Sequence, residues 1–136
     1  MKASFDFFND LPRRTIRVRM TGEFDVQSIE RFAEEYREVT REYAGQAHFV
    51  LADMRGTAPI APDVAIVLGE VMAWSRRHGV VRCVHCSDDT VYRLQAARLG
   101  RMSSPHDDLT VDVVSVDEGE RVLSEAMIGL EARLHG

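Results

Sequence analysis

The sequence has 136 residues, 45% of them hydrophobic, and its 17 basic and 22 acidic residues give a formal net charge of −5. A chain of this length and composition suits one domain, residues 1–136, around one core, whereas the acidic balance argues against a sequence-independent grip on nucleic-acid phosphates. No apolar run approaches the about 20 residues of a membrane span, no signal-peptide pattern opens the chain and two cysteines do not make a disulfide framework, so we expect a cytoplasmic protein.

Two segments near the N-terminus have the pattern of paired β-strands. Residues 3–8 are rich in phenylalanine and are predicted to form an edge strand, and residues 9–12 have the composition of a turn. In residues 15–21 apolar and polar side chains alternate strictly, which places the apolar ones on one face of a strand. The two segments are therefore expected to pair as a hairpin.

A long helix is predicted to follow Asp25, which is a favourable N-cap residue. Between Val26 and Tyr43 apolar residues recur every three or four positions and form one stripe, whereas charged residues occupy the opposite face. Gly45 is a suitable residue for the C-terminal end of this helix.

The stretch from His48 to Gly56 is predicted to contain the central strand. It opens with a continuous apolar run and then turns to charge and glycine, which is typical of a strand buried on both faces. Ligands and partners of open α/β sheets gather beyond the carboxyl ends of central strands. Asp53 and Arg55 are therefore candidates for a cleft surface, and an intramolecular ion pair between them is the alternative.

Residues 62–77 predict a helix that is apolar around most of its circumference. Beyond its main apolar stripe, Ile66 and Trp74 extend the apolar surface, and little charge appears before Arg76. A helix of this kind is usually buried on more than one side. We therefore expect its second side, with Ile66 and Trp74, to form a homodimer contact.

The remaining segments complete an alternation of strands and helices. Residues 80–86 predict an interior strand, residues from Ser87 or Asp88 to Leu99 a third helix, and residues 109–114 the last strand, after which Asp117 is expected to cap a terminal amphipathic helix. The order ββαβαβαβα predicts an α/β fold with a single mixed sheet of about five strands, covered by about four helices.

No segment has the spacing of a catalytic or metal site. Cys83 and Cys86 have the C-x-x-C spacing, but on a strand they point to opposite faces, and a second ligand pair is missing. Two buried thiols are the preferred interpretation, and a reactive Cys86 beyond the strand end is the alternative. We predict no cofactor, no metal site and no catalytic residue, and the sequence shows no Ser–His–Asp arrangement for its histidines, His48, His78, His85, His106 and His135.

The predicted third helix and the loop after it are polar and locally basic. Arg93, Arg98 and Ser104 are candidates for holding an anion or an acidic partner. A solvated helix face with an exposed loop is the alternative for these residues.

The order of elements and the loop after the central strand resemble the STAS fold of anti-sigma-factor antagonists, in particular its SpoIIAA-like branch. The matching features extend from Thr15 to about Leu130 and include residues 18–24, 50–56 and 79–84. In regulatory STAS proteins, a serine that opens the helix after the central strand is phosphorylated by a partner kinase. An ungapped comparison places Pro62 at this serine, so the resemblance implies a branch without the phosphorylatable serine. Asp63 is interpreted as a first-turn residue that the helix dipole stabilises by about 0.3–1 kcal/mol, rather than as a phosphomimic.

The resemblance and the absence of a catalytic pattern lead us to expect a non-enzymatic STAS-like protein-interaction or regulatory module. We expect it to act as a homodimer through the second helix and to have an unidentified protein partner. The alternative is a carrier of a small ligand, a lipid or a nucleotide, near the second and third helices. The third hypothesis is an enzyme that uses Asp53, Arg55, Cys86 or His106.

Overall fold

The computed structural model describes residues 1–87 and 109–135. In these residues five strands form a single sheet in the order β1-β2-β3-β4-β5, with β1 antiparallel to β2 and the other neighbours parallel. The predicted α/β class with a single mixed sheet of about five strands is therefore confirmed. The strands are β1 (Ser4–Asp10), β2 (Thr15–Thr21), β3 (His48–Asp53), β4 (Val80–Cys86) and β5 (Thr110–Val113).

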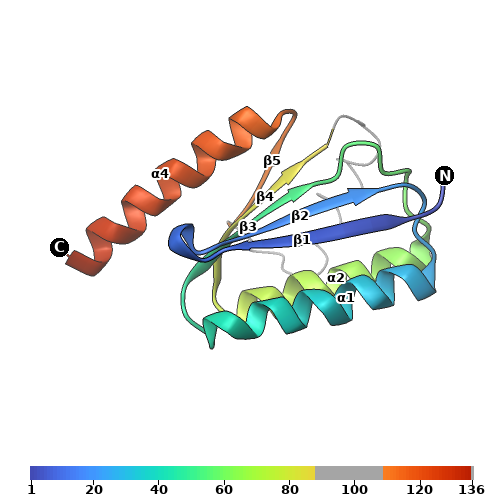
Figure 1. The fold of residues 1–136 in the computed structure, drawn as a ribbon, viewed down its shortest axis with the longest axis horizontal. Coiled ribbons are helices and arrows are strands. Elements are labelled where there is room, and N and C mark those ends of the chain that lie inside the picture. The colour runs from blue at the N-terminus through green and yellow to red at the C-terminus, as the bar shows by residue number, and fades with distance from the viewer. Residues whose placement is uncertain (88–108, 136) are drawn as a thin grey trace.

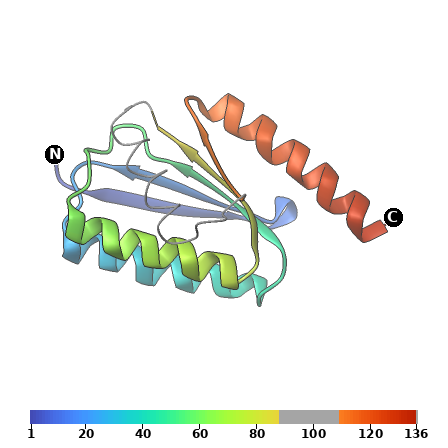
Figure 2. The ribbon, with the colours of Figure 1, turned by 180° about the vertical axis from the view of Figure 1, so that it is seen from behind.

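Helices cover both faces of this sheet (Figures 1 and 2). α1 (Val26–Thr40) and α2 (Pro62–Arg77) lie side by side on one face, and α4 (Val116–His135) lies on the other. The described residues have the order ββαβαββα, and the third helix predicted between Ser87 and Leu99 falls in a part of the chain that the structure does not describe. None of the described helices combines the length and the apolar character required to cross a membrane.

The two N-terminal strands pair as predicted, but β1 is longer than expected, because Asn9 and Asp10, which were predicted to lie in the turn, are its last two residues. β1 and β2 pair as a hairpin, with Ser4 opposite Thr21 and Asp10 opposite Thr15. α1 begins with a capping box, in which Asp25 Oδ1 accepts a hydrogen bond from the backbone N–H of Ser28 at 2.8 Å and Ser28 Oγ accepts one from the backbone N–H of Asp25 at 2.9 Å. The buried face of α1 then packs on the sheet through Ser28, Ile29, Phe32, Ala33, Tyr36 and Thr40.

β3 lies in the middle of the sheet, between β2 and β4, as the apolar run predicts. Every residue of β3 except Asp53 is buried. Successive side chains face opposite sides, so that Val50 and Ala52 pack in the core beneath α1 and α2, whereas Phe49 and Leu51 pack in the core beneath α4. Because β3 contributes to both cores, it connects the packing of the helices on the two faces.

α2 buries one stripe against the sheet and directs Trp74 toward α1. The Trp74 ring packs edge-on against Tyr36 at a centroid distance of 6.2 Å and stacks on His78 at 4.0 Å. The guanidinium of Arg37 lies 5.9 Å from the same ring, within the range of a cation–π contact. Ile66, by contrast, is 64% exposed. Trp74 and Ile66, which were predicted to share a homodimer contact, therefore differ within one chain, because Trp74 packs against α1 and Ile66 is exposed to solvent.

α4 is the predicted amphipathic terminal helix, but its capping residue differs from the prediction. Ser115 Oγ accepts a hydrogen bond from the backbone N–H of Glu118 at 3.1 Å, so the prediction of Asp117 as the cap is wrong, because Asp117 lies inside the first turn. Gly119 then brings the helix close to the sheet, since a Cβ there would lie 2.9 Å from Cδ1 of Leu51. Farther on, α4 crosses the sheet obliquely and its C-terminal end extends past the β1–β2 turn (Figure 1).

Candidate functional site

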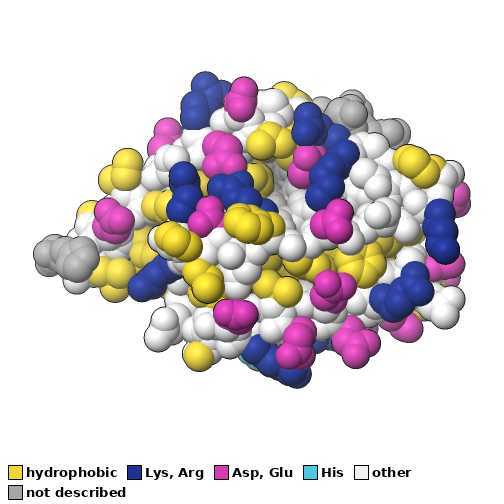
Figure 3. Space-filling view, in the orientation of Figure 1, with side chains coloured by type: hydrophobic (Ala, Val, Ile, Leu, Met, Phe, Trp, Pro, Cys, Tyr) yellow, Lys and Arg dark blue, Asp and Glu magenta, His cyan; other side chains and the backbone are white. Residues whose placement is uncertain are grey.

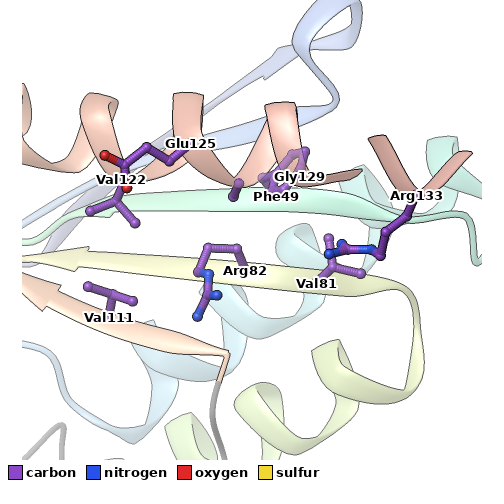
Figure 4. A pocket seen from close by; sticks show the side chains of 9 residues that line it. Phe49, Val81, Arg82, Val111, Val122, Glu125, Gly129 and Arg133 are labelled. Carbon is purple, nitrogen blue, oxygen red and sulfur yellow. The ribbon is translucent and has the colours of Figure 1, made fainter. Parts of the chain in front are cut away.

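The described residues form a cleft of about 460 Å³ between α4 and the sheet (Figure 4). Its floor is mostly apolar and comes from β3, β4 and β5, and α4 supplies the opposite wall. Ala126 and Gly129 are small residues on that wall, which leaves space between the helix and the strands. The residues that line the cleft are Phe49, Val81, Arg82, Val111, Val122, Glu125, Ala126, Gly129 and Arg133.

A register irregularity between β3 and β4 shapes the floor of this cleft. His48 pairs with Val80, but the next residue, Phe49, pairs with Arg82, so Val81 is passed over in the pairing with β3. A bulge of this kind interrupts the alternation of side chains along a strand. Val81 and Arg82, although adjacent in the chain, both line the cleft, and an arginine is thereby placed beside an apolar surface.

A smaller cleft of about 210 Å³ lies between α4 and the β1–β2 turn. Phe49 lines both clefts, and the smaller one also contains Arg13, Arg14 and Glu131. Together the two clefts contain four arginines and two glutamates, although the whole chain is acidic. Figure 3 shows hydrophobic side chains at the surface around α4, among basic and acidic ones. This side of the molecule is suited to an anion that carries an apolar portion.

Asp53 and Arg55, the candidates at the end of β3, form an ion pair with each other. Arg55 donates hydrogen bonds from Nε and Nη2 to the two carboxylate oxygens of Asp53, each at 2.9 Å. Nη1 of Arg19 lies 3.5 Å from the same carboxylate and donates to the carbonyl oxygen of Arg55 at 2.6 Å. Burial raises the pKa of Asp53, but the hydrogen bonds from Arg55 and the charge of Arg19 leave this pKa below its ordinary value. The two arginines and the carboxylate stabilise the loop between β3 and α2.

The candidates on α2 do not form a cluster. Asp63 is exposed in the first turn, where its Oδ1 accepts a hydrogen bond from the backbone N–H of Val64 at 2.9 Å, in agreement with the first-turn interpretation. Ile66 is exposed, whereas Trp74 packs against α1. The remaining candidates, Arg93, Arg98 and Ser104, lie between residues 88 and 108, outside the described residues.

The two cysteines face opposite sides of β4, as predicted. Cys83 packs against the core beneath α1 and α2, and Cys86 is fully buried in the core beneath α4. The alternative of a reactive Cys86 beyond the strand end is wrong, because Cys86 is part of β4 and pairs with Val113. His85 was not among the predicted site residues, and its Nε2 lies 3.2 Å from Sγ of Cys83. The alternation of side chains along β4 contains the signal for this pair, since residues two apart share a face.

Comparisons with known proteins do not place the chain in a family. No protein-family model matches the sequence, and no curated protein matches it. The fold and the lining of the cleft beneath α4 are therefore the observations from which a function is inferred.

Proposed function

We propose that this protein is a non-enzymatic binding module with a STAS-like fold of the SpoIIAA-like type, and that it holds a long-chain fatty acid in the cleft beneath α4. The observation that carries this proposal is the combination of an apolar floor and two arginines in one cleft of about 460 Å³. Pockets for small molecules commonly measure about 300–1,000 Å³ and combine apolar walls with a few polar groups. A lipid carrier with its site near the second and third helices was the alternative predicted from the sequence, and we now propose the lipid site beneath α4.

The fold supports the STAS-like part of the proposal. The sheet is mixed, the loop after β3 leads directly into α2, and helices cover both faces. Pro62 is the first residue of α2 and has no hydroxyl group, so a module of this type binds without the serine switch of regulatory STAS proteins.

The apolar floor supplies the surface that an acyl chain requires. Val81, Val111 and Val122 are only half-buried although they lie beside the core, so solvent-accessible apolar surface lies within the cleft. Each methylene group that leaves water on binding stabilises a complex by about 0.8 kcal/mol. The acyl chain therefore provides most of the binding free energy in this proposal.

The arginines supply the group that recognises the carboxylate. Arg82 enters the cleft from β4 and Arg133 from the last turns of α4 (Figure 4). A guanidinium forms charge-assisted, bidentate hydrogen bonds with a carboxylate. Glu125 lines the same cleft, so two positive groups face one negative group there, and an anionic headgroup is favoured over a cationic one.

The proposal is tested by titration with a fluorescent long-chain fatty acid and displacement by unlabelled oleic acid. Gly129→Leu places a large side chain in the cleft, and Ser124→Leu at an exposed position of α4 is the matched control. We expect saturable binding to the parent protein, a loss of about tenfold or more in affinity for Gly129→Leu, and little change for Ser124→Leu. Binding that does not saturate, or an equal affinity of Gly129→Leu and the parent, would overturn the proposal.

The role of the arginines is tested separately with Arg133→Gln. This variant is expected to weaken binding of the fatty acid but to leave binding of the corresponding fatty alcohol unchanged, because only the acid carries a charge for the guanidinium. Equal losses for the acid and the alcohol would show that Arg133 acts through packing rather than through its charge.

A second candidate function is a homodimeric interaction module that uses α2. The observation in its favour is Ile66, a large hydrophobic side chain on α2 that is 64% exposed. Ile66→Glu is the appropriate test, because Trp74→Glu would also disrupt the contacts of Trp74 with Tyr36 and His78. Light scattering is expected to show a dimer for the parent and a monomer for Ile66→Glu, and a monomeric parent would contradict this candidate.

A further inference from the structure

A thiol, an imidazole and a carboxylate lie next to one another on the face of the sheet that carries α1 and α2. Sγ of Cys83 is 3.2 Å from Nε2 of His85, and Nδ1 of His85 is 3.9 Å from Oδ1 of Asp112. Cys83 and His85 share this face because they are two residues apart on β4. The parallel register of β4 and β5 pairs His85 with Asp112 and brings the carboxylate to the same side.

The three groups differ in their access to solvent. His85 is 8% exposed, so its ring is held between its neighbours, whereas Cys83 is half-buried and the side chain of Asp112 is 31% exposed. A half-buried thiol beside a buried imidazole has the surroundings of a reactive cysteine rather than those of an inert core cysteine. Cys86, on the opposite face of the same strand, is fully buried and provides an internal comparison.

We propose that Cys83 is a nucleophilic thiol that exchanges with low-molecular-weight disulfides, with His85 as its proton acceptor and Asp112 as the residue that positions the imidazole. This inference goes beyond the proposed fatty-acid binding and does not rest on it, because the thiol faces α1 and α2 and the cleft lies beneath α4. The site would accept a small, neutral disulfide, and its product is a mixed disulfide at Cys83.

The exchange step is balanced without any further oxidant. The proton of the Cys83 thiol passes to Nε2 of His85, and the thiolate attacks one sulfur atom of the disulfide. A new S–S bond forms to Cys83 as the old one breaks, and the other sulfur leaves as a thiolate that takes the proton from His85. In the tautomer in which Nε2 accepts the proton, Nδ1 carries the hydrogen, and the negative charge of Asp112, 3.9 Å from Nδ1, favours this tautomer.

In the part of the chain that the structure describes, α1 and α2 carry further ionisable groups on this side of the sheet. Burial raises the pKa of the Tyr36 hydroxyl on α1, and the nearby Cys83 contributes to this shift. Arg76 on α2 has a buried Nη1 atom on the same side of the sheet. Variants at His85 are therefore needed to distinguish the effect of the imidazole on the reactivity of Cys83 from the effects of these groups.

The experiment measures the rate at which a neutral pyridyl disulfide reacts with the folded protein, from the absorbance of the released thiopyridone. Cys86→Ser leaves only Cys83, and Cys83→Ser leaves only Cys86. At about pH 6 an ordinary thiol with a pKa of about 8.5 is less than about 1% ionised, and an imidazole-paired thiolate is ionised almost completely. A thiolate of low pKa is also less nucleophilic, which offsets part of this advantage. We therefore expect the folded Cys86→Ser protein to react at about pH 6 about tenfold faster than the same protein unfolded in urea.

Two further variants in the Cys86→Ser background assign the roles of the neighbours. His85→Gln is expected to slow the reaction at about pH 6 by about tenfold and to restore the steep pH dependence of an ordinary thiol. Asp112→Asn is expected to move the onset of reactivity to higher pH while the protein stays folded by circular dichroism, an effect that a purely structural role would not produce.

Several results would overturn the proposal. One is a reaction rate of the folded Cys86→Ser protein that rises with pH as steeply as the rate of an ordinary thiol. This result can be obtained without any variant at His85. Another is the absence of any reaction at Cys83 until the protein is unfolded, which would show that the thiol is closed to reagents. Equal rates for His85→Gln and its parent at about pH 6 would also exclude the imidazole as the proton acceptor.

Discussion

Arg17 on β2 and Glu120 on α4, 103 residues apart in the chain, form a two-point ion pair across the sheet–helix interface. Nη2 of Arg17 donates to Oε2 of Glu120 at 3.2 Å, and Nη1 donates to Oε1. The hydrogen bonds from Arg17 lower the pKa of Glu120, and those to Glu120 raise the pKa of Arg17. This pair lies next to Gly119, where a Cβ would lie 2.9 Å from Leu51 of the sheet, and it joins the N-terminal half of α4 to β2.

The ion pair predicts a measurable loss of stability for Glu120→Gln. The two side chains are 26% and 33% exposed, so solvent screens part of the interaction, and we expect the free energy of unfolding to fall by about 1 kcal/mol. Glu38→Gln is the matched control, because its pair with Arg41 is about 70% exposed on both sides and is expected to contribute less than about 0.5 kcal/mol. Urea denaturation measures both variants, and equal effects would contradict the structural role of the pair.

A buried histidine predicts how stability depends on pH. His48 is fully buried, stacks on Tyr43 at a centroid distance of 4.4 Å, and its Nδ1 lies 2.8 Å from the carbonyl oxygen of Gln46. Burial lowers the pKa of His48 in the folded state below 6.5, its value in the unfolded chain. The unfolded state therefore binds more protons below about pH 6.5, so the contribution of His48 is complete above that pH and is lost as the pH falls toward the folded pKa.

The variant His48→Phe tests this origin of the pH dependence. Phenylalanine keeps a flat ring beside Tyr43 but cannot bind a proton, so the decrease in the free energy of unfolding between about pH 7 and pH 5 is expected to be smaller than in the parent. An identical decrease in the two proteins, measured by urea denaturation across this range, would assign the pH dependence to other groups.

Two glycines of α4 predict opposite effects of the same substitution. Gly119→Ala gains helix propensity of about 1 kcal/mol but places a Cβ at 2.9 Å from Leu51 and 3.2 Å from Val84, and overpacking of this kind costs about 1–3 kcal/mol. We expect a net loss of about 1 kcal/mol. At Gly129 the atom nearest to an added Cβ would be Nη1 of Arg133, at 3.8 Å, which is an ordinary contact distance. Gly129→Ala is therefore expected to stabilise the protein by about 0.5–1 kcal/mol. Thermal unfolding distinguishes the signs, and stabilisation by both substitutions would contradict close packing at Gly119.

The hydrogen bonds of Arg19 predict that this side chain keeps the loop between β3 and α2 ordered. Its Nη1 donates to the carbonyl oxygens of Arg55 at 2.6 Å and Met20 at 3.1 Å, and it lies 3.5 Å from the Asp53 carboxylate. Arg19→Met is expected to lower the free energy of unfolding by about 1 kcal/mol and to speed amide hydrogen exchange in residues 54–61. Unchanged exchange in this loop would show that the backbone holds its conformation without Arg19.

Periodic patterns in the sequence predicted the five strands of the single mixed sheet and the three helices that the structure describes. The apolar run of β3, the alternation of β2 and the stripe of α1 are each produced by residues close in the chain. β2 and β3 formed where their patterns indicated, whereas α1 ends at Thr40 and a short 3-10 helix continues to Tyr43. The opposite orientation of Cys83 and Cys86 followed from the same local rule. Such properties depend on the geometry of one strand or one helix, which the local sequence contains.

The candidate sites depended on relationships that local patterns do not contain. The bulge that places Val81 and Arg82 on one side of β4, and the register that pairs His85 with Asp112, are properties of neighbouring strands. The contact of Trp74 with Tyr36 depends on how α1 and α2 pack against each other. The sequence by itself determined which residues form strands and helices, because hydrophobic period is local. Only the tertiary structure decided which side chains meet, because register and helix placement result from packing between segments far apart in the chain.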